Sequence, residues 1–287
     1  MNLRNGIKAS LVPVFAAALL AGCNGTDSKA VSPYDSPAVA ASIPGDHYIF
    51  KWNGSSWDQT ANGGGHIISA DAGGVPWVIN SSGDIWKKND GTLNSSFTQK
   101  SGKATDIDIG ADGSVWILGN TLIPGTNDYP IYKWNGSSWS QATSGGGVKI
   151  AVDPNGVPWV MNNSGDIWKK NDNTLGSAFT QKPGKAVDID IGADGSVWKL
   201  GNTVIPGTSD FAVYKWNGSS WDQTSSGGGV TITVAPNGVP WIINSAGNIW
   251  KKNDSGLTSS FTQQSGTGSD IDIGANGSVW LLGVSAI

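Results

Sequence analysis

Several residue types on which catalytic sites depend are scarce or missing in this chain. Its 287 residues include no glutamate, one cysteine and two histidines, His47 and His66, neither of which recurs in the repeats described below. One cysteine and two unrepeated histidines cannot form a Ser-His-Asp or Cys-His catalytic set, so the sequence predicts that the protein is not an enzyme. Because Cys23 is the sole cysteine, an intrachain disulfide is excluded, and stability must come from packing and strand pairing.

Positive charge of the kind that binds nucleic acids is also scarce. Arg4 is the only arginine, so the rest of the chain lacks the side chain that contacts phosphate and guanine through two parallel hydrogen bonds. Charged residues make up 14% of the sequence and the net charge is −4. We therefore expect no nucleic-acid partner.

The first 22 residues have the pattern of a signal peptide. Arg4 and Lys8 supply a positive start, and residues 9–20 form an apolar stretch that is too short to span a bilayer. The following residues, 23–44, are rich in Ser, Ala, Pro and Gly without an apolar period, which predicts a flexible tether. We expect one folded domain over residues 45–287.

The end of this leader, Leu20-Ala21-Gly22-Cys23, resembles the bacterial lipobox. The resemblance implies that Cys23 is lipidated and becomes the new N-terminus, with several acyl chains giving stable anchoring. The alternative is an ordinary signal peptide followed by a free thiol. Asn24 stands where an aspartate would retain a lipoprotein in the inner membrane of a Gram-negative cell, so the resemblance favours the outer membrane or the cell surface.

What the sequence has in abundance is an internal repeat. All 15 tryptophans fall into five triplets whose members are 82 residues apart, such as Trp52, Trp134 and Trp216. Each 82-residue unit is itself double, because Gly74-Val75-Pro76-Trp77 matches Gly113-Ser114-Val115-Trp116 at a spacing of 39 residues. The chain therefore contains six half-units of about 40 residues.

Each half-unit holds four short β-like runs separated by turn residues. One half-unit has runs at 105–109, 114–118, 131–134 and 138–141, with Asp112-Gly113 and Asn135-Gly136 as turns. No helical periodicity extends over ten residues beyond the leader. Six four-stranded units of this length predict an all-β fold, a six-bladed β-propeller of antiparallel blades. A stacked open solenoid is the alternative.

The ends of the folded region favour a ring. It begins with the third and fourth strands of a blade, residues 48–59, and finishes with the first and second strands, residues 270–282. We therefore expect the last blade to be assembled from both ends, with N-terminal strands pairing with C-terminal strands. An open stack would have no use for this arrangement.

The segments Ile107–Trp139 and Ile189–Trp221 share the pattern Ile-x-x-Gly-x-x-Gly-x-x-Trp followed by Ile-Tyr-x-Trp-x-Gly-x-x-Trp or a close variant. This pattern resembles tectonin repeats, and the likeness covers about residues 46–284. The resemblance implies a β-propeller, often six-bladed, and a lectin that binds glycans such as lipopolysaccharide through repeated sites. The alternation of two blade types departs from the family pattern and suggests three equivalent sites rather than six.

Three tryptophans are the first candidates for contacting a sugar. Trp52, Trp134 and Trp216 each precede an Asn-Gly turn, and lysines take their place in the other type of half-unit. We expect a position that accepts either residue to lie near solvent, where the ring stacks on a sugar and neighbouring polar groups bind its hydroxyls. The alternative is an amphipathic ring that covers a blade edge. The candidate carbohydrate contacts are Trp52, Asn53, Trp134, Asn135, Trp216, Asn217, Lys88, Asn89, Lys170, Asn171, Lys252 and Asn253.

Three Asp-Ile-Asp runs provide weak candidates for a metal site. Alternation along a strand places both acids of a run on one face, and carboxylates around a channel suit a hard cation such as Ca²⁺. The interpretation we favour is that these side chains accept backbone N–H groups at the blade turns, with no metal and no cofactor. The six residues are Asp106, Asp108, Asp188, Asp190, Asp270 and Asp272.

The two resemblances together imply an envelope lipoprotein that binds glycan or lipopolysaccharide through repeated sites. Each site would be weak, and several on one rigid domain would bind more tightly through avidity. The alternative is a scaffold that binds a protein partner through loops such as 120–130 and 202–212. We expect a monomer that contacts the membrane through its lipid anchor only.

Overall fold

The computed structural model describes residues 45–287, which form 22 β-strands and no helix. The expected signal peptide (1–22), Cys23 and the tether (23–44) lie outside the described residues. Within residues 45–287 there is no helix that is long and apolar enough to cross a membrane. All strand pairs are antiparallel, as expected from the short runs and tight turns.

Two of the sheets have four strands each. The first consists of β10 (Lys149–Val152), β11 (Pro158–Met161), β12 (Asp166–Lys170) and β13 (Phe179–Lys185). The second consists of β14 (Asp188–Ile191), β15 (Val197–Val204), β16 (Phe211–Trp216) and β17 (Trp221–Gly229). In both, strands that follow one another in sequence are neighbours in space.

The other two sheets have seven strands, because each contains two four-stranded groups that share one long strand. One runs through β3 (Ile67–Ala70), β4 (Pro76–Ile79), β5 (Asp84–Lys88), β6 (Phe97–Ile109), β7 (Val115–Gly119), β8 (Tyr129–Trp134) and β9 (Trp139–Gly147). The other runs through β18 (Thr231–Val234), β19 (Pro240–Ile243), β20 (Asn248–Lys252), β21 (Phe261–Ile273), β22 (Val279–Ala286), β1 (His47–Trp52) and β2 (Trp57–Gly65). The shared strands are β6 and β21.

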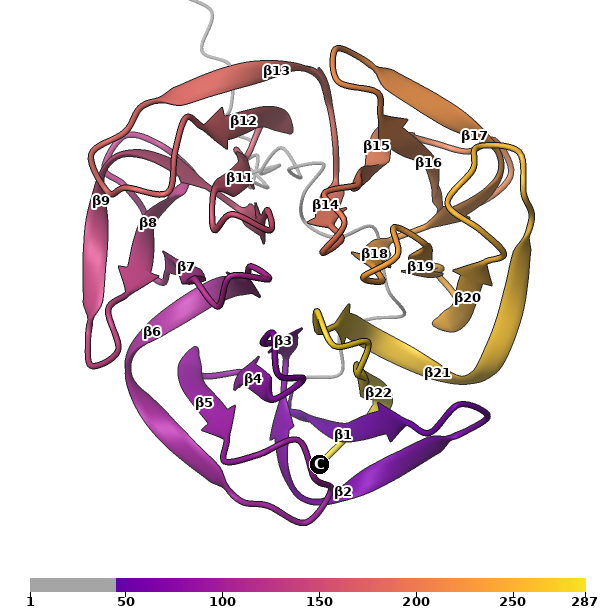
Figure 1. Cartoon of the computed structure of the whole chain (residues 1–287), viewed down its shortest axis with the longest axis horizontal. Coiled ribbons are helices and arrows are strands. Elements are labelled where there is room, and N and C mark those ends of the chain that lie inside the picture. The colour runs from indigo at the N-terminus through magenta and orange to yellow at the C-terminus, as the bar shows by residue number, and fades with distance from the viewer. Residues whose placement is uncertain (1–44) are drawn as a thin grey trace, which may run out of the picture. The chain divides into compact units, whose positions relative to one another are not determined.

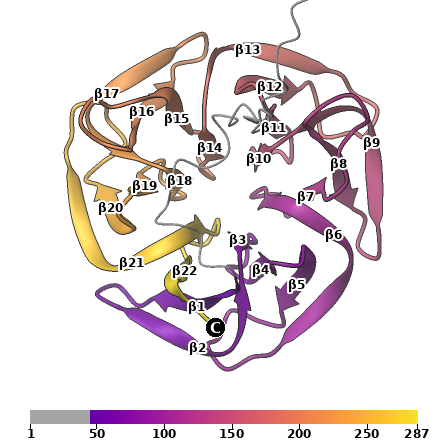
Figure 2. The same cartoon turned by 180° about the vertical axis from the view of Figure 1, so that it is seen from behind.

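The sheets are arranged radially about a central axis, with the first strand of each group innermost (Figures 1 and 2). These inner strands contact one another in the order β3, β6, β10, β14, β18, β21 and again β3. At the seam, β1 pairs with β22 through Ile49–Leu282 and Lys51–Trp280, and the Ile287 N–H donates to the Asp46 carbonyl at 2.7 Å. Residues from both ends of the described region therefore lie in one sheet.

The core lies between neighbouring sheets. Trp116 in β7 is fully buried among residues of β10 and β11, and its indole N–H donates to the Gly156 carbonyl at 3.0 Å. Trp198 and Trp280 make the same contact with the next group, through Gly238 and Gly74. Each of these aromatic side chains joins two sheets, so packing between sheets depends on the repeated tryptophan.

The fourth strands are longer than the sequence predicts. The run expected at 138–141 continues through three glycines to the end of β9 at Gly147. A Cβ at Gly145 would lie 2.6 Å from the Phe179 ring, and one at Gly147 would lie 2.6 Å from the Met161 carbonyl oxygen. These glycines therefore permit a close approach between sheets.

Candidate functional site

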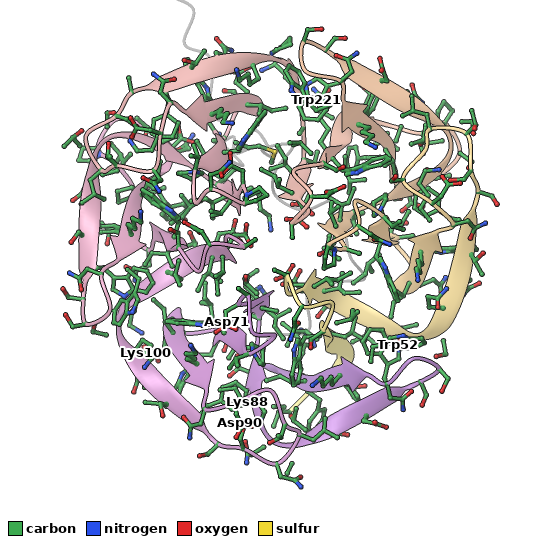
Figure 3. All side chains as sticks on the ribbon, viewed as in Figure 1. Trp52, Asp71, Lys88, Asp90, Lys100 and Trp221 are labelled. Atoms are coloured by element: carbon green, nitrogen blue, oxygen red, sulfur yellow. The ribbon has the colours of Figure 1, made fainter. Side chains whose placement is uncertain are left out.

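A hollow of about 590 Å³, largely open to solvent, lies on the outer part of the β3–β9 sheet. We call it the rim pocket. It is lined by Asp84, Gln99, Lys100, Ser101, Gly102, Lys103 and Asn120. Figure 3 labels Lys100 at the outer edge of the ring of sheets. The lining offers a carboxylate, two amines and two amides, which together accept and donate hydrogen bonds in several directions.

Several contacts hold the rim pocket in shape. The Lys103 amine lies 2.6 Å from the Asp84 carboxylate and donates to the Ser82 carbonyl at 2.8 Å. The hydrogen bond from the Lys103 amine lowers the pKa of the Asp84 carboxyl group, so this acid is charged at neutral pH. The Trp139 indole donates to the Ser101 carbonyl at 2.7 Å and fixes the irregular stretch of β6 at Ser101–Gly102, where the strand register shifts. A site that is already formed binds with less loss of conformational entropy.

The second 82-residue copy repeats the lining of the rim pocket except for Pro183 in place of Ser101, and the third changes its charged residues. The charged residues of the first copy correspond to the same residue types in the second, Asp166, Lys182 and Lys185. The Lys185 amine lies 2.6 Å from the Asp166 carboxylate. In the third copy all three charges are gone, because the corresponding residues are Asn248, Gln264 and Thr267. Val284 also stands there in place of Asn120. The chain thus carries two charged versions of this surface and one neutral version.

Sequence reasoning did not find the rim pocket, because polar residues in exposed strand ends look alike. A signal was nevertheless present in the repeat. Asp84 and Lys103 are retained together in the second copy and lost together in the third, as expected of two side chains that contact each other. Comparison of the copies position by position would have brought these residues together.

The predicted sugar-stacking tryptophans lie between neighbouring four-stranded groups. Trp134 is half-buried, with its ring centre 4.8 Å from that of Trp139 and 6.2 Å, edge-on, from that of Trp77 in the neighbouring group. Trp52 and Trp216 have the same surroundings. This arrangement fits the alternative interpretation, an amphipathic ring that covers a sheet edge. Their neighbours Asn53, Asn135 and Asn217 are exposed and use their side-chain oxygens to accept N–H groups of their own turns.

The expectation that Lys88, Lys170 and Lys252 lie near solvent is wrong. All three side chains have 0% exposure. The Lys88 amine donates to the carbonyls of Ser95 and Leu93 in the loop that follows, and it lies 4.8 Å from the centre of the Phe97 ring. Burial lowers the pKa of Lys88. In the other type of half-unit, tryptophan takes the position of these lysines. Here the aliphatic stem of the lysine fills the space and its amine donates to backbone carbonyls. Because the three side chains are fully buried, they cannot contact a sugar.

The Asn89, Asn171 and Asn253 candidates beside them are exposed but serve the same loops. The Asn89 amide donates to the Ser96 hydroxyl at 2.9 Å, and its oxygen accepts from Thr98 at 2.6 Å. Asn171 and Asn253 accept in the same way from Thr180 and Thr262. The sequence-based sugar site therefore separates into loop-forming side chains, not a single concave surface.

Replacing Lys88 with methionine is expected to lower the free energy of unfolding by about 1–3 kcal/mol, because the carbonyls it satisfies lose a donor inside the protein. Chemical denaturation measures this change. Lys87→Met is the matched control, since Lys87 is partly exposed and forms an ion pair at 3.0 Å with Asp71, a kind of contact worth about 0–1 kcal/mol. Equal losses in both variants would contradict the buried role of Lys88.

The six aspartates of the Asp-Ile-Asp runs surround the central axis. Their carboxylates accept backbone N–H groups, but these belong to the neighbouring inner strand and not to the turns as expected. Asp106 accepts from Ile150 at 2.8 Å and Asp188 accepts from Ile232 at 2.8 Å. The other four make equivalent bonds, those of Asp108, Asp190, Asp270 and Asp272. Within residues 45–287 no group of three or more His, Cys, Asp or Glu side chains is placed to hold a metal ion.

These carboxylates sit in an unfavourable electrostatic environment. Burial raises the pKa of Asp188 to about 6 and of Asp270 to about 7. Burial, followed by the charge of other aspartates in the ring, raises the pKa of Asp108 and Asp190 well above the usual value. Lys149 is the one cation among the groups that act on this inner set, and its amine lies 3.9 Å from the Asp106 carboxylate.

The fold and the repeats define the class of the protein: an all-β chain of antiparallel four-stranded groups packed side by side, as in β-propellers. It belongs to the tectonin domain family, whose model matches residues 38–198 and 117–286. The chain is also similar to the solved structure "YCF48 bound to D1 peptide", with 14% identity, a TM-score of 0.48 and coverage of 80% of this chain and 84% of that one. It is similar as well to the "Structure of Dos1 propeller", with 11% identity, a TM-score of 0.46 and coverage of 77% of this chain and 68% of that one. No curated protein matches it.

Proposed function

We propose that the protein is a non-enzymatic envelope lipoprotein that binds carbohydrate at the rim pocket and at its second-copy counterpart. The observation that carries this proposal is the rim pocket itself: an open cavity lined by Asp84, Gln99, Lys100, Lys103 and Asn120. Polyhydroxylated ligands need donors and acceptors side by side, and this lining supplies both. Membership of the tectonin family supports the same proposal.

We also propose that the strands make six blades in a closed ring. The sharing of β6 and β21 between groups, the circular order of contacts among the inner strands and the pairing of β1 with β22 support it. A ring holds the first- and second-copy sites at a fixed separation. Two weak sites on one rigid body would bind a repetitive glycan more tightly than either alone.

Lipid attachment at Cys23 completes the proposal. The lipobox-like Leu20-Ala21-Gly22-Cys23 supports anchoring in the outer membrane or at the cell surface, where lipopolysaccharide and other glycans are at hand. Metabolic labelling with a fatty-acid analogue tests this part. Label that persists in Cys23→Ser would count against it.

The third copy supplies variants for testing the rim pocket. Asp84→Asn, Lys100→Gln and Lys103→Thr give the first copy the residues of the third, and Asp166→Asn, Lys182→Gln and Lys185→Thr do so for the second. We expect the sixfold variant to keep its melting temperature within a few degrees and to lose at least tenfold in glycan affinity, about 1.4 kcal/mol. A glycan array that includes lipopolysaccharide, followed by calorimetry, measures the change.

The matched control changes loop residues outside the rim pocket, Asn89→Ser and Asn171→Ser. It should bind as the unchanged chain does. If the unchanged chain binds no glycan and no lipopolysaccharide, carbohydrate binding is wrong. If it binds and the sixfold variant binds equally well, the site lies elsewhere on the protein.

A protein-binding scaffold is the second candidate. Leu122 and Val204 are exposed, at 45% and 40%, where the loops expected to contact a partner begin. Exposed apolar side chains at matching positions of two copies suit a protein contact. A single stoichiometric protein captured by the unchanged chain, released by Leu122→Ser with Val204→Ser but not by free sugar, would favour this function over the first.

A further inference from the structure

The two histidines lie next to each other in the first copy. Their ring centres are 6.3 Å apart with 30° between the ring planes. His47 belongs to β1, where it pairs with Gly65 of β2 and with Ala286 of β22. His66 lies between β2 and β3, and its backbone N–H donates to the Ile79 carbonyl at 2.7 Å. The pair therefore sits where strands from both ends of the described chain meet.

The fold does not require either histidine. Tyr129 and Phe211 stand at the position of His47 in the other copies, and Val148 and Val230 stand at the position of His66. Aromatic and aliphatic side chains thus serve these two places equally well. Both imidazoles occur in the same copy and in contact range, which is the arrangement expected of two side chains with a joint task.

One imidazole nitrogen lacks a partner. His47 is buried, at 5% exposure, and its Nδ1 has no hydrogen bond. Only two other buried side-chain nitrogen or oxygen atoms in the described residues are in this state, the indole nitrogens of Trp77 and Trp159. An unsatisfied buried polar atom lowers stability by about 1–3 kcal/mol. A bound group that accepted the lone pair of this imidazole would remove that loss.

We propose that His47 and His66 form a two-histidine site for a divalent transition metal ion of the zinc, nickel and copper class. Imidazole is a preferred ligand of these ions. With metal–nitrogen bonds of about 2.0–2.1 Å, the centres of two coordinated rings lie roughly 5 Å apart at a tetrahedral angle and about 6.4 Å apart when the rings are on opposite sides of the ion. The 6.3 Å separation of this pair corresponds to the second arrangement, and an approach of about 1 Å would give the first. Water or an external ligand completes the coordination, since the protein supplies two side chains.

The surroundings favour the neutral form of the His66 imidazole. Burial lowers the pKa of His66, the charges of His47 and Lys149 act in the same direction, and Asp46 opposes them. The neutral ring is the form that binds a metal. The Asp46 carboxylate accepts the Ser81 N–H at 2.6 Å, so it balances charge near the site while its position is fixed. A bound ion would tie β1 to the turn that leads into β3.

The test uses the full chain, purified without a histidine tag and with Cys23→Ser so that no thiol binds the metal. Zinc or nickel chloride in tenfold excess is expected to raise the melting temperature, and calcium or magnesium chloride is not. The matched variants are His47→Tyr and His66→Val, which take the residues of the second copy. We expect each to fold without metal and to bind zinc at least tenfold more weakly by calorimetry.

A spectroscopic measurement keeps the test independent of how the variants fold. One equivalent of Cu²⁺ on the histidine-containing chain should give an electron paramagnetic resonance spectrum with coupling to two imidazole nitrogens. The same zinc affinity in both variants, or a copper spectrum without nitrogen coupling, overturns the proposal. Neither outcome bears on the rim pocket, whose residues are different.

Discussion

Deleting residues 270–287 is expected to abolish cooperative unfolding of the domain. The deletion removes β22 and the end of β21, and with them the partner of β1. It also removes Trp280 and Leu282, which are fully buried against Ile49 and Ile68. Truncating one large core side chain costs about 3–5 kcal/mol, and a whole domain is stable by only about 5–15 kcal/mol. Near-ultraviolet circular dichroism during heating measures the loss.

The control keeps every strand and moves the chain ends. Because Ile287 donates a hydrogen bond to Asp46, a short Gly-Ser linker can join residue 287 to residue 45. New ends can then be opened in the exposed turn at Asn135-Gly136. We expect this circular permutant to melt cooperatively. A deletion variant that also melts cooperatively would show that the seam between β1 and β22 is dispensable and would count against a closed ring.

The strands were predictable because their signals are local. The runs expected at 114–118 and 131–134 correspond to β7 and β8, since short apolar runs next to the Asp-Gly and Asn-Gly turns define them. Features that depend only on one strand and its adjoining turns can therefore be predicted from a single sequence.

Features that depend on several distant strands were not predictable. Lys88 is buried because loop carbonyls fold back over its amine. The exchange of Trp for Lys between half-units had suggested an exposed position, which was wrong. The rim pocket joins side chains of β5, β6 and the end of β7. The ring of aspartates was visible as a pattern, but the N–H groups that satisfy it belong to other sheets, and no local signal specifies them.

That ring of aspartates makes the stability of the domain depend on pH. We expect the stabilisation from these protonated aspartates to be complete below about pH 4, and the free energy of unfolding to fall by at least about 2 kcal/mol between pH 5 and pH 8. In the unfolded chain an aspartate has a pKa of about 3.9, whereas in the folded domain the pKa of Asp188 is about 6 and that of Asp270 about 7. The folded state therefore holds protons that the unfolded state has lost, and this stabilisation disappears as the pH rises through the folded-state values.

Lys149 offsets the charge that develops in this ring. The aspartates around it, Asp106 first, raise its pKa, and the other copies hold Ile67 and Thr231 at its position. Lys149→Thr is expected to lower the free energy of unfolding at pH 8 by about 1–3 kcal/mol, less than the loss of a fully buried partner because its side chain is 35% exposed. At pH 5 the loss should be smaller, since more of the carboxylates are then neutral.

Asp108→Asn is the opposite test of the same electrostatics. The amide oxygen can still accept the Val152 N–H that the carboxylate accepts now, while the charge that burial and Asp272 disfavour is gone. We expect this variant to be more stable than the unchanged chain at pH 8, and by a smaller margin at pH 5, as measured by urea unfolding at both pH values. If Asp108→Asn destabilises the domain equally at both, the aspartates act through their hydrogen bonds alone, and Lys149 has no repulsion to relieve.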